Sequence, residues 1–203
     1  MNKKKILNME NVIENYFIEK KIIISKLDFK KIEHLVDELV KLRSKKGRLI
    51  FLGIGGSAGN CSHAVNDFRK LCGIESYCPT DNVSEITART NDDGFETIFS
   101  KWLKVSNLNK NDALFIMSVG GGDKKKNVSV NLINAIKYAK KVRSKVFSIV
   151  GKKEGFAYVH SNISIFVDVE NKKHLTPHAE SFQTAIWHSI VSHPKLQIHK
   201  TKW

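Results

Sequence analysis

The sequence predicts an α/β protein built on a mostly parallel sheet. After residue 48, short apolar segments of strand length alternate with longer segments that have helical periodicity. The short segments are apolar throughout, as expected for strands that are buried on both faces. Strands of this kind, alternating with helices, predict a sheet that is covered by helices on both sides.

The N-terminal part of the chain, from about Asn11 to Lys46, predicts two helices. Apolar residues recur at helical spacing in the second of them, and Gly47 ends the run. We therefore expect a single domain over residues 1–203, made of a helical arm (1–47) and an α/β core (48–203). The apolar positions of the second helix are Phe29, Ile32, Leu35, Val36, Leu39 and Leu42.

The core contains five predicted strands and four predicted helices. Thr176 and Pro177 predict the start of the last helix, as N-cap and first helical residue. In a parallel sheet, ligands bind at the carboxyl ends of the strands, so we look for functional residues there. The strands are expected at Leu49–Gly53, Ser76–Cys78, Ala113–Ser118, Lys145–Val150 and Ile163–Val169. The helices are expected at Ser57–Leu71, Phe95–Lys104, Val128–Lys141 and Pro177–Ser192.

The composition is that of an ordinary soluble protein, with 41% hydrophobic and 27% charged residues. No apolar run approaches the roughly 18 residues that span a bilayer, and the N-terminus lacks the pattern of a signal peptide. We therefore expect a cytoplasmic protein without membrane contact. Cys61, Cys72 and Cys78 match no zinc-binding spacing, so we interpret them as free thiols.

A net charge of +14 is compatible with binding to nucleic acid, to a membrane surface or to an anionic small substrate. The lysines are scattered along the chain, and no basic cluster carries the interleaved aromatic residues that stack on bases. We favour a solvated basic surface over a nucleic-acid site.

Two glycine-rich turns follow predicted strands and precede predicted helices. In the first turn, Gly55, Gly56 and Ser57 combine a flexible backbone with a helix N-terminus and a hydroxyl that caps the helix, a combination that binds phosphate groups. The dinucleotide-binding spacing fails, because Ala58 stands where the third glycine is required.

The second turn follows the predicted strand that ends at Ser118. It contains Gly120, Gly121 and Gly122 and leads into three lysines, residues 124–126. Backbone amides together with mobile cations form a second plausible anion cradle, although the lysines fit an exposed surface turn equally well. Two such turns at neighbouring strand ends predict one shared phosphate site.

Two helices carry pairs of ionisable residues. His63 and Asp67 are four residues apart and share a helix face, whereas Glu180 and His188 are eight apart on the last helix. If the pairs meet over the turns, they form an acid/base pair or a metal site. If they do not, they are separate exposed residues, and the spacing alone leaves both readings open.

Taken together, these motifs resemble the phosphoheptose isomerases, which are proteins of the SIS (sugar isomerase) type. The resemblance extends over nearly the whole chain. It rests on the first turn, the helix with His63 and Asp67, the segment Asn91-Asp92-Asp93-Gly94-Phe95, the Ser118 turn and the His188 helix. It implies a five-stranded parallel, doubly wound, flavodoxin-like sheet in homotetramers with shared active sites. It also implies conversion of sedoheptulose 7-phosphate to the glycero-manno-heptose 7-phosphate used for lipopolysaccharide or capsule.

The resemblance also implies roles for individual residues. Zinc is expected at His63, Asp67, Glu180 and His188, with Asp67, Glu180 and His188 as acid/base residues. Asn91, Asp92 and the residues of the two turns are expected to contact the substrate, a phosphorylated sugar.

The chain departs from the family pattern at several of these positions. Asp67 and Glu180 replace Glu and Gln, Ile54 replaces Asn, and glycines replace a Ser/Thr-rich phosphate loop. A non-catalytic protein that binds a sugar phosphate, or that regulates another process, is therefore the alternative.

Overall fold

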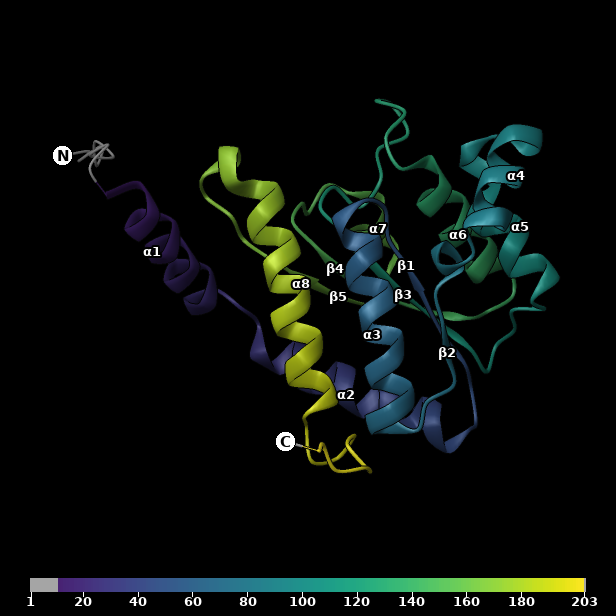
Figure 1. Ribbon diagram of the computed structural model, residues 1–203, viewed down its shortest axis with the longest axis horizontal. Helices are drawn as coiled ribbons and strands as arrows, with labels where there is room; N and C mark the ends of the chain where they lie inside the picture. Colours follow the sequence, from purple (N-terminus) through teal and green to yellow (C-terminus); the bar gives the residue numbers. More distant parts are fainter. Residues whose placement is uncertain (1–10, 203) are drawn as a thin grey trace.

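The computed structural model describes residues 11–202 and contains a five-stranded parallel sheet in the order β2-β1-β3-β4-β5 (Figure 1). The predicted α/β fold is confirmed. Strand order reverses between β1 and β3, so the crevice beyond their carboxyl ends is the expected place for a ligand. The strands are β1 (Leu49–Leu52), β2 (Ser76–Tyr77), β3 (Ala113–Ser118), β4 (Lys145–Val150) and β5 (Ile163–Phe166).

Helices cover both faces of the sheet because β1, β3 and β4 have apolar side chains on both sides. Phe51 and its neighbours face one core with Phe68 and Trp187, while Ile50 and Leu52 face the other. Among residues 11–202, no helix is long and apolar enough to cross a membrane. The first core lies under α2 (Phe29–Ser44), α3 (Gly56–Cys72) and α8 (Leu175–Val191). The second lies under α5 (Ile98–Val105), α6 (Val130–Lys141) and α7 (Phe156–His160).

The N-terminal arm forms the two expected helices. Helix α1 (Val12–Ser25) extends away from the body at the left of Figure 1, and Ile23 is its buried residue. Helix α2 buries Leu35, Leu39 and their neighbours on the apolar stripe, as predicted. The arm therefore packs on the core mainly through α2.

The structure corrects several helix boundaries. Helix α8 begins at Leu175 with His174 at the N-cap, so Thr176 is not the cap. Pro177 is tolerated there because proline lacks an N–H group, and the N–H groups of the first helical turn have no acceptor within the helix. Helix α4 (Val83–Asp93) was not predicted, since it buries none of its residues and Val83 and Ile86 are its only large apolar side chains. The helix expected from Phe95 opens with a short 3₁₀ turn.

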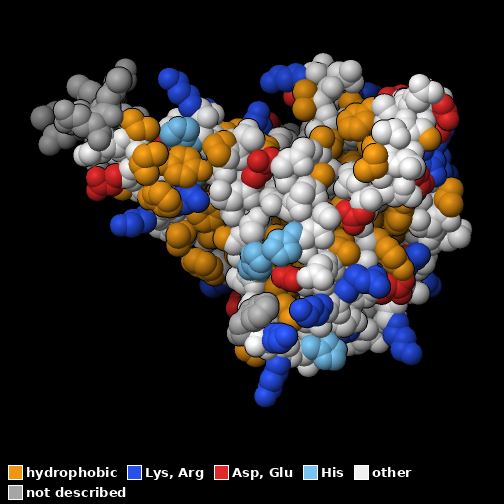
Figure 2. All heavy atoms as spheres, in the orientation of Figure 1, with side chains coloured by type: hydrophobic (Ala, Val, Ile, Leu, Met, Phe, Trp, Pro, Cys, Tyr) orange, Lys and Arg blue, Asp and Glu red, His pale blue; other side chains and the backbone are white. Residues whose placement is uncertain are grey.

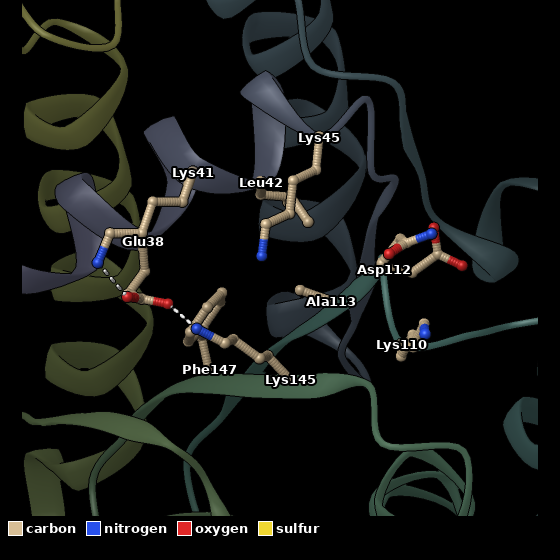
Figure 3. A pocket seen from close by; sticks show the side chains of 10 residues that line it. Glu38, Lys41, Leu42, Lys45, Lys110, Asp112, Ala113, Lys145 and Phe147 are labelled. Atoms are coloured by element: carbon tan, nitrogen blue, oxygen red, sulfur yellow. Dashed lines mark hydrogen bonds and ion pairs between the residues drawn. The ribbon is translucent and has the colours of Figure 1, made fainter.

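A small hollow lies at the amino ends of β3 and β4, opposite the edge that carries the glycine turns (Figure 3). Glu38 of α2 accepts hydrogen bonds there from Lys41 and Lys145, which ties α2 to the sheet. The hollow has a volume of about 30 Å³, which has room for a water molecule but not for a sugar. We therefore assign this hollow a structural role.

Candidate functional site

The first glycine turn joins β1 to α3 and brings a carboxylate to the start of the helix. Gly55 has φ +62° and ψ −130°, a conformation that favours glycine, and it is the N-cap residue in place of the predicted Ser57. A Cβ atom on Gly56 would lie 2.5 Å from Oε2 of Glu180, so a larger residue there would displace the Glu180 carboxyl group from this position. The Glu180 carboxyl thus sits at the positive end of α3, where a helix favours negative charge.

The second glycine turn is held rigidly in place. The Ser118 hydroxyl accepts a hydrogen bond from the Gly121 amide at 2.9 Å, and the carbonyls of Gly121 and Gly122 accept from the start of α7. Gly121 and Gly122 have φ values of +71° and +90°. Gly120 is the open position, since a Cβ atom there would meet nothing within 4 Å. The Ser118 O–H group remains available as a donor to a ligand.

The three lysines after this turn lie on a separate loop. Asp123 and Val128 form an antiparallel bridge that closes the loop, and the Asp123 carboxylate accepts from the amides of Lys125 and Lys126. The lysine side chains are exposed. This arrangement matches the surface-turn reading, and their contact with phosphate remains a prediction.

Helices α3 and α8 run side by side across the sheet and bring three of the predicted residues together (Figure 1). Asp67 Oδ2 lies 4.0 Å from His63 Nε2 and 3.9 Å from His188 Nε2. The two imidazole rings are 5.3 Å apart and nearly perpendicular, and the His188 ring packs on buried Trp187. Histidine side chains are visible on this face of the molecule (Figure 2). One carboxylate oxygen between two accessible imidazoles can exchange protons or bind a divalent metal.

The fourth predicted member of this group is not part of it. Glu180 lies two turns from His188, about 12 Å along the axis of α8, because the helix rises 1.5 Å per residue. Among residues 11–202, the potential metal-ligand group between α3 and α8 contains His63, Asp67 and His188. Glu180 is instead the carboxylate at Gly56, so the single chain does not bring the four expected ligands together, and the four-ligand site stays a prediction.

Two other predicted substrate contacts lie elsewhere on the chain. Asn91 and Asp92 are exposed near the end of α4 and form a hydrogen bond with each other at 2.8 Å. Helix α4 packs on α5 and on neighbouring 3₁₀ turns. Their contact with substrate stays a prediction.

Sequence analysis did not identify Asn60, which connects α3 to α8 through hydrogen bonds. Asn60 donates to the Glu180 carbonyl at 3.0 Å and to Gln183 at 2.9 Å, and it accepts from Thr184 at 2.9 Å. Asn60 and Asp67 lie seven residues apart and so share one face of α3. This spacing is the sequence signal that could have placed Asn60 on the same face as Asp67. These bonds fix the position of Glu180 relative to the first turn.

The cysteines do not take part in this chemistry. Cys61, Cys72 and Cys78 are buried and free, as predicted. Burial raises the pKa of the Cys61 thiol well above its usual range and that of Cys72 to about 12. A buried thiol with a raised pKa is a poor nucleophile, which applies to Cys61 and Cys72. The pKa of Cys78 is lowered, chiefly by a hydrogen bond with Cys61, but Cys78 is not part of the group formed by His63, Asp67 and His188.

Comparison with known proteins identifies the family. No family model matches the chain. The phosphoheptose isomerase of Buchnera aphidicola subsp. Schizaphis graminum is 30% identical over 171 residues, which cover 81% of this chain and 75% of that protein. The chain belongs to the phosphoheptose isomerase family. Its members are sugar-phosphate isomerases, so the family resemblance stated from the motifs is confirmed.

Two further comparisons concern the fold of this phosphoheptose isomerase family member and the length of its relatives. The phosphoheptose isomerase structure from Neisseria gonorrhoeae has a TM-score of 0.76 at 20% identity, with 91% of this chain and 98% of that chain aligned, and it supports the fold. The lincomycin biosynthesis protein LmbN of Streptomyces lincolnensis is 28% identical over 154 residues. That match covers 71% of this chain but only 54% of LmbN, so the chain spans about half the length of that relative.

Proposed function

We propose that this chain interconverts a ketose phosphate and an aldose phosphate, with sedoheptulose 7-phosphate as the substrate. The observation that carries the proposal is the convergence of His63, Asp67 and His188 on one face of α3 and α8. Membership of the phosphoheptose isomerase family supports the same reaction. The product would be a glycero-manno-heptose 7-phosphate.

The phosphate group is best accommodated by the Ser118 turn. Gly120 is open, Ser118 retains a hydroxyl donor, and the glycines allow close approach of the backbone. The first turn is less suitable for a phosphate because the Glu180 carboxylate already faces Gly56 and would repel a second anion. We therefore assign Glu180 to the sugar hydroxyls, and Ser57, which is 2% exposed, to the support of the turn.

The carbonyl end of the sugar lies at the opposite end of a seven-carbon chain from the phosphate. Asp67 is eleven residues, or about 16 Å, along α3 from Gly56, so the turn that holds the phosphate and the Asp67 group that meets the reacting carbons would come from neighbouring subunits. Isomerisation removes a proton from C1, passes through a cis-enediol, and returns a proton to C2. Asp67 is the base in this proposal, because its carboxylate lies between both imidazoles whereas Glu180 is two helical turns away. His188 moves protons between the oxygens on C1 and C2.

A divalent metal fits the same three side chains. Two imidazoles and one carboxylate are a donor set that zinc accepts, with a fourth position open for water or substrate. The spacings of 3.9 and 4.0 Å are slightly wider than in a formed tetrahedral site, where ligand atoms lie about 3.4 Å apart. A metal bound there would polarise a sugar oxygen.

The test is turnover of sedoheptulose 7-phosphate by the full chain in D₂O, with and without added zinc, followed by NMR. We expect aldose to form and deuterium to enter at the carbons that exchange protons. Asp67→Asn should lower kcat by about 10²–10⁴-fold, the range for loss of an acid/base group. Lys70→Gln, an exposed change on the same helix, should leave kcat within about twofold.

Binding without turnover or deuterium exchange, with zinc present, would reject the isomerase and leave a non-catalytic sugar-phosphate-binding protein. Turnover that survives Asp67→Asn would reject Asp67 as the base while keeping the reaction.

A further inference from the structure

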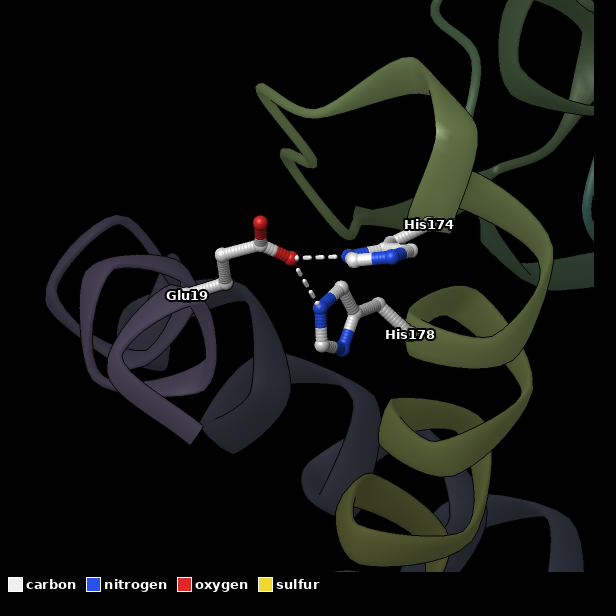
Figure 4. A group of neighbouring side chains, drawn as sticks. All are labelled: Glu19, His174 and His178. Carbon is white, nitrogen blue, oxygen red and sulfur yellow. Dashed lines mark hydrogen bonds and ion pairs between the residues drawn. The ribbon is translucent and has the colours of Figure 1, made fainter. Parts of the chain in front are cut away.

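Three potential metal ligands also meet where the N-terminal arm touches the start of α8 (Figure 4). Glu19 of α1 points its carboxylate at two rings, with Oε2 lying 2.7 Å from His174 Nδ1 and 2.7 Å from His178 Nε2. The histidines are four residues apart and therefore project from one face. The group shares no residue with His63, Asp67 and His188 or with either glycine turn.

Neighbouring side chains hold this group in place. Asn171 donates to Glu19 Oε1 at 2.7 Å, and the Asn171 side-chain oxygen accepts from the Lys173 amide at 3.2 Å. Tyr16 stacks on the His178 ring at 4.2 Å. His178 is completely buried, while the Glu19 and His174 side chains are 18% and 32% exposed, so one side of the group is open to water.

Hydrogen bonds account for these contacts when both rings carry a proton toward Glu19. His174 Nδ1 and His178 Nε2 then donate to Oε2, and Asn171 donates to Oε1. A divalent cation would compete with these protons for the same three ligand atoms, because metal ligands must be deprotonated.

We propose that Glu19, His174 and His178 form a second divalent-metal site, with zinc as its ion and water as the fourth ligand. Two imidazoles and one carboxylate suit the borderline-soft character of zinc, and they match the three-ligand sites that keep one open position. Zinc replaces the protons that the two rings would otherwise share with Glu19.

The geometry needs only a small adjustment to accept the ion. Ligand atoms around a tetrahedral zinc lie about 3.4 Å apart, compared with the 2.7 Å spacings in the group. Glu19 and His174 can move outward because both are partly exposed, whereas His178 is fixed by its burial and by Tyr16.

The site would clamp the arm to the core. Glu19 and His174 are 155 residues apart in the chain, so one ion would connect α1 directly to α8. This role is structural and does not depend on the isomerase reaction. The two inferences can therefore fail separately.

The experiment removes the first histidine group and then asks whether zinc remains. The full chain with His63→Ala and His188→Ala, untagged and freed of metal, is dialysed against zinc and analysed for metal content. We expect about one zinc per chain. Adding Glu19→Gln should lower the zinc affinity at least tenfold, while adding Glu14→Gln, an exposed change on the same helix, should leave it unchanged.

Thermal unfolding by circular dichroism provides the second measurement. Zinc should raise the Tm of the double variant and of its Glu14→Gln form, but not that of its Glu19→Gln form. His174→Ala, at a partly exposed position, replaces Glu19→Gln if that variant does not fold. The proposal is overturned if the double variant binds no zinc, or if binding survives both Glu19→Gln and His174→Ala.

Discussion

At the scale of single residues, the two glycine turns differ in what they can bind. Glu180 supplies a negative charge to the first turn, whereas Gly120 in the second is unobstructed. The sequence indicated both turns as anion sites because a glycine motif reveals backbone freedom but not which side chain folds over it. The carboxylate that distinguishes them comes from a helix more than 120 residues away.

Gly120→Asp should weaken binding of the phosphorylated substrate, because it places a carboxylate in the open cradle. A side chain fits at this position without a clash and without a positive φ, so we expect the fold to persist. KM should rise by about tenfold or more, corresponding to roughly 1.4 kcal/mol of lost binding. Gly120→Ala adds the Cβ atom without the charge and should change KM by less than threefold. Equal KM values for the two variants, measured by NMR turnover, would place the phosphate elsewhere.

At the scale of helices and strands, α2 is connected to the sheet by one buried carboxylate. The Glu38 side chain is 10% exposed and is paired with Lys145 and Lys41. The hydrogen bond from Lys145 is the main reason that the pKa of Glu38 falls to about 2. A carboxylate with a lower pKa in the folded state than in the unfolded state stabilises the fold only while it is ionised.

Glu38→Gln should therefore lower the free energy of unfolding at pH 7 by about 1.5–3 kcal/mol, the range for a hydrogen bond to a charged group. The difference in the free energy of unfolding between wild type and Glu38→Gln is complete above a pH of about 4.5. It is lost as the pH falls toward about 2. Urea unfolding at pH 7 and at pH 3 measures the difference. Glu33→Gln on the same helix, with a 59% exposed side chain, should change stability by less than about 0.5 kcal/mol. A constant gap between wild type and Glu38→Gln across this pH range would contradict the assignment.

The accuracy of the sequence predictions depended on local signals. Strands β3 and β4 were predicted to the residue, because polar residues or glycines bound these largely apolar runs. Helix α4 was missed because it has only two large apolar side chains, Val83 and Ile86, and buries none of its residues. The pair His63 and Asp67 could be predicted from helical spacing, whereas the meeting of Glu19 with His174 requires knowing how α1 folds back.

At the scale of the whole molecule, the arm leaves apolar surface without cover in the single chain. Val12, Ile13 and Phe17 of α1 are 53%, 73% and 57% exposed, and hydrophobic side chains are visible over this arm (Figure 2). An apolar groove of about 430 Å³ lies beside it, between the arm and α8. Its apolar lining comes from Ile24, Leu27, Phe29, Ile32, Val36, Phe182, Ala185 and Ile186.

Exposed apolar surface of this extent favours self-association, since burying it gains about 25 cal/mol per Å². We therefore predict at least a dimer and, from the family resemblance, a homotetramer. Light scattering after size exclusion at micromolar concentration should give a multiple of the 23.0 kDa chain mass. Phe17→Glu adds a charge to the exposed face of α1 and should shift the population toward monomer, because a charge buried at an interface is costly. Val105→Glu, at a 72% exposed position on α5, makes the same replacement away from the arm and should leave the mass unchanged. A wild-type chain that stays monomeric at these concentrations would exclude the assembly, and the exposed face of α1 would then need another partner.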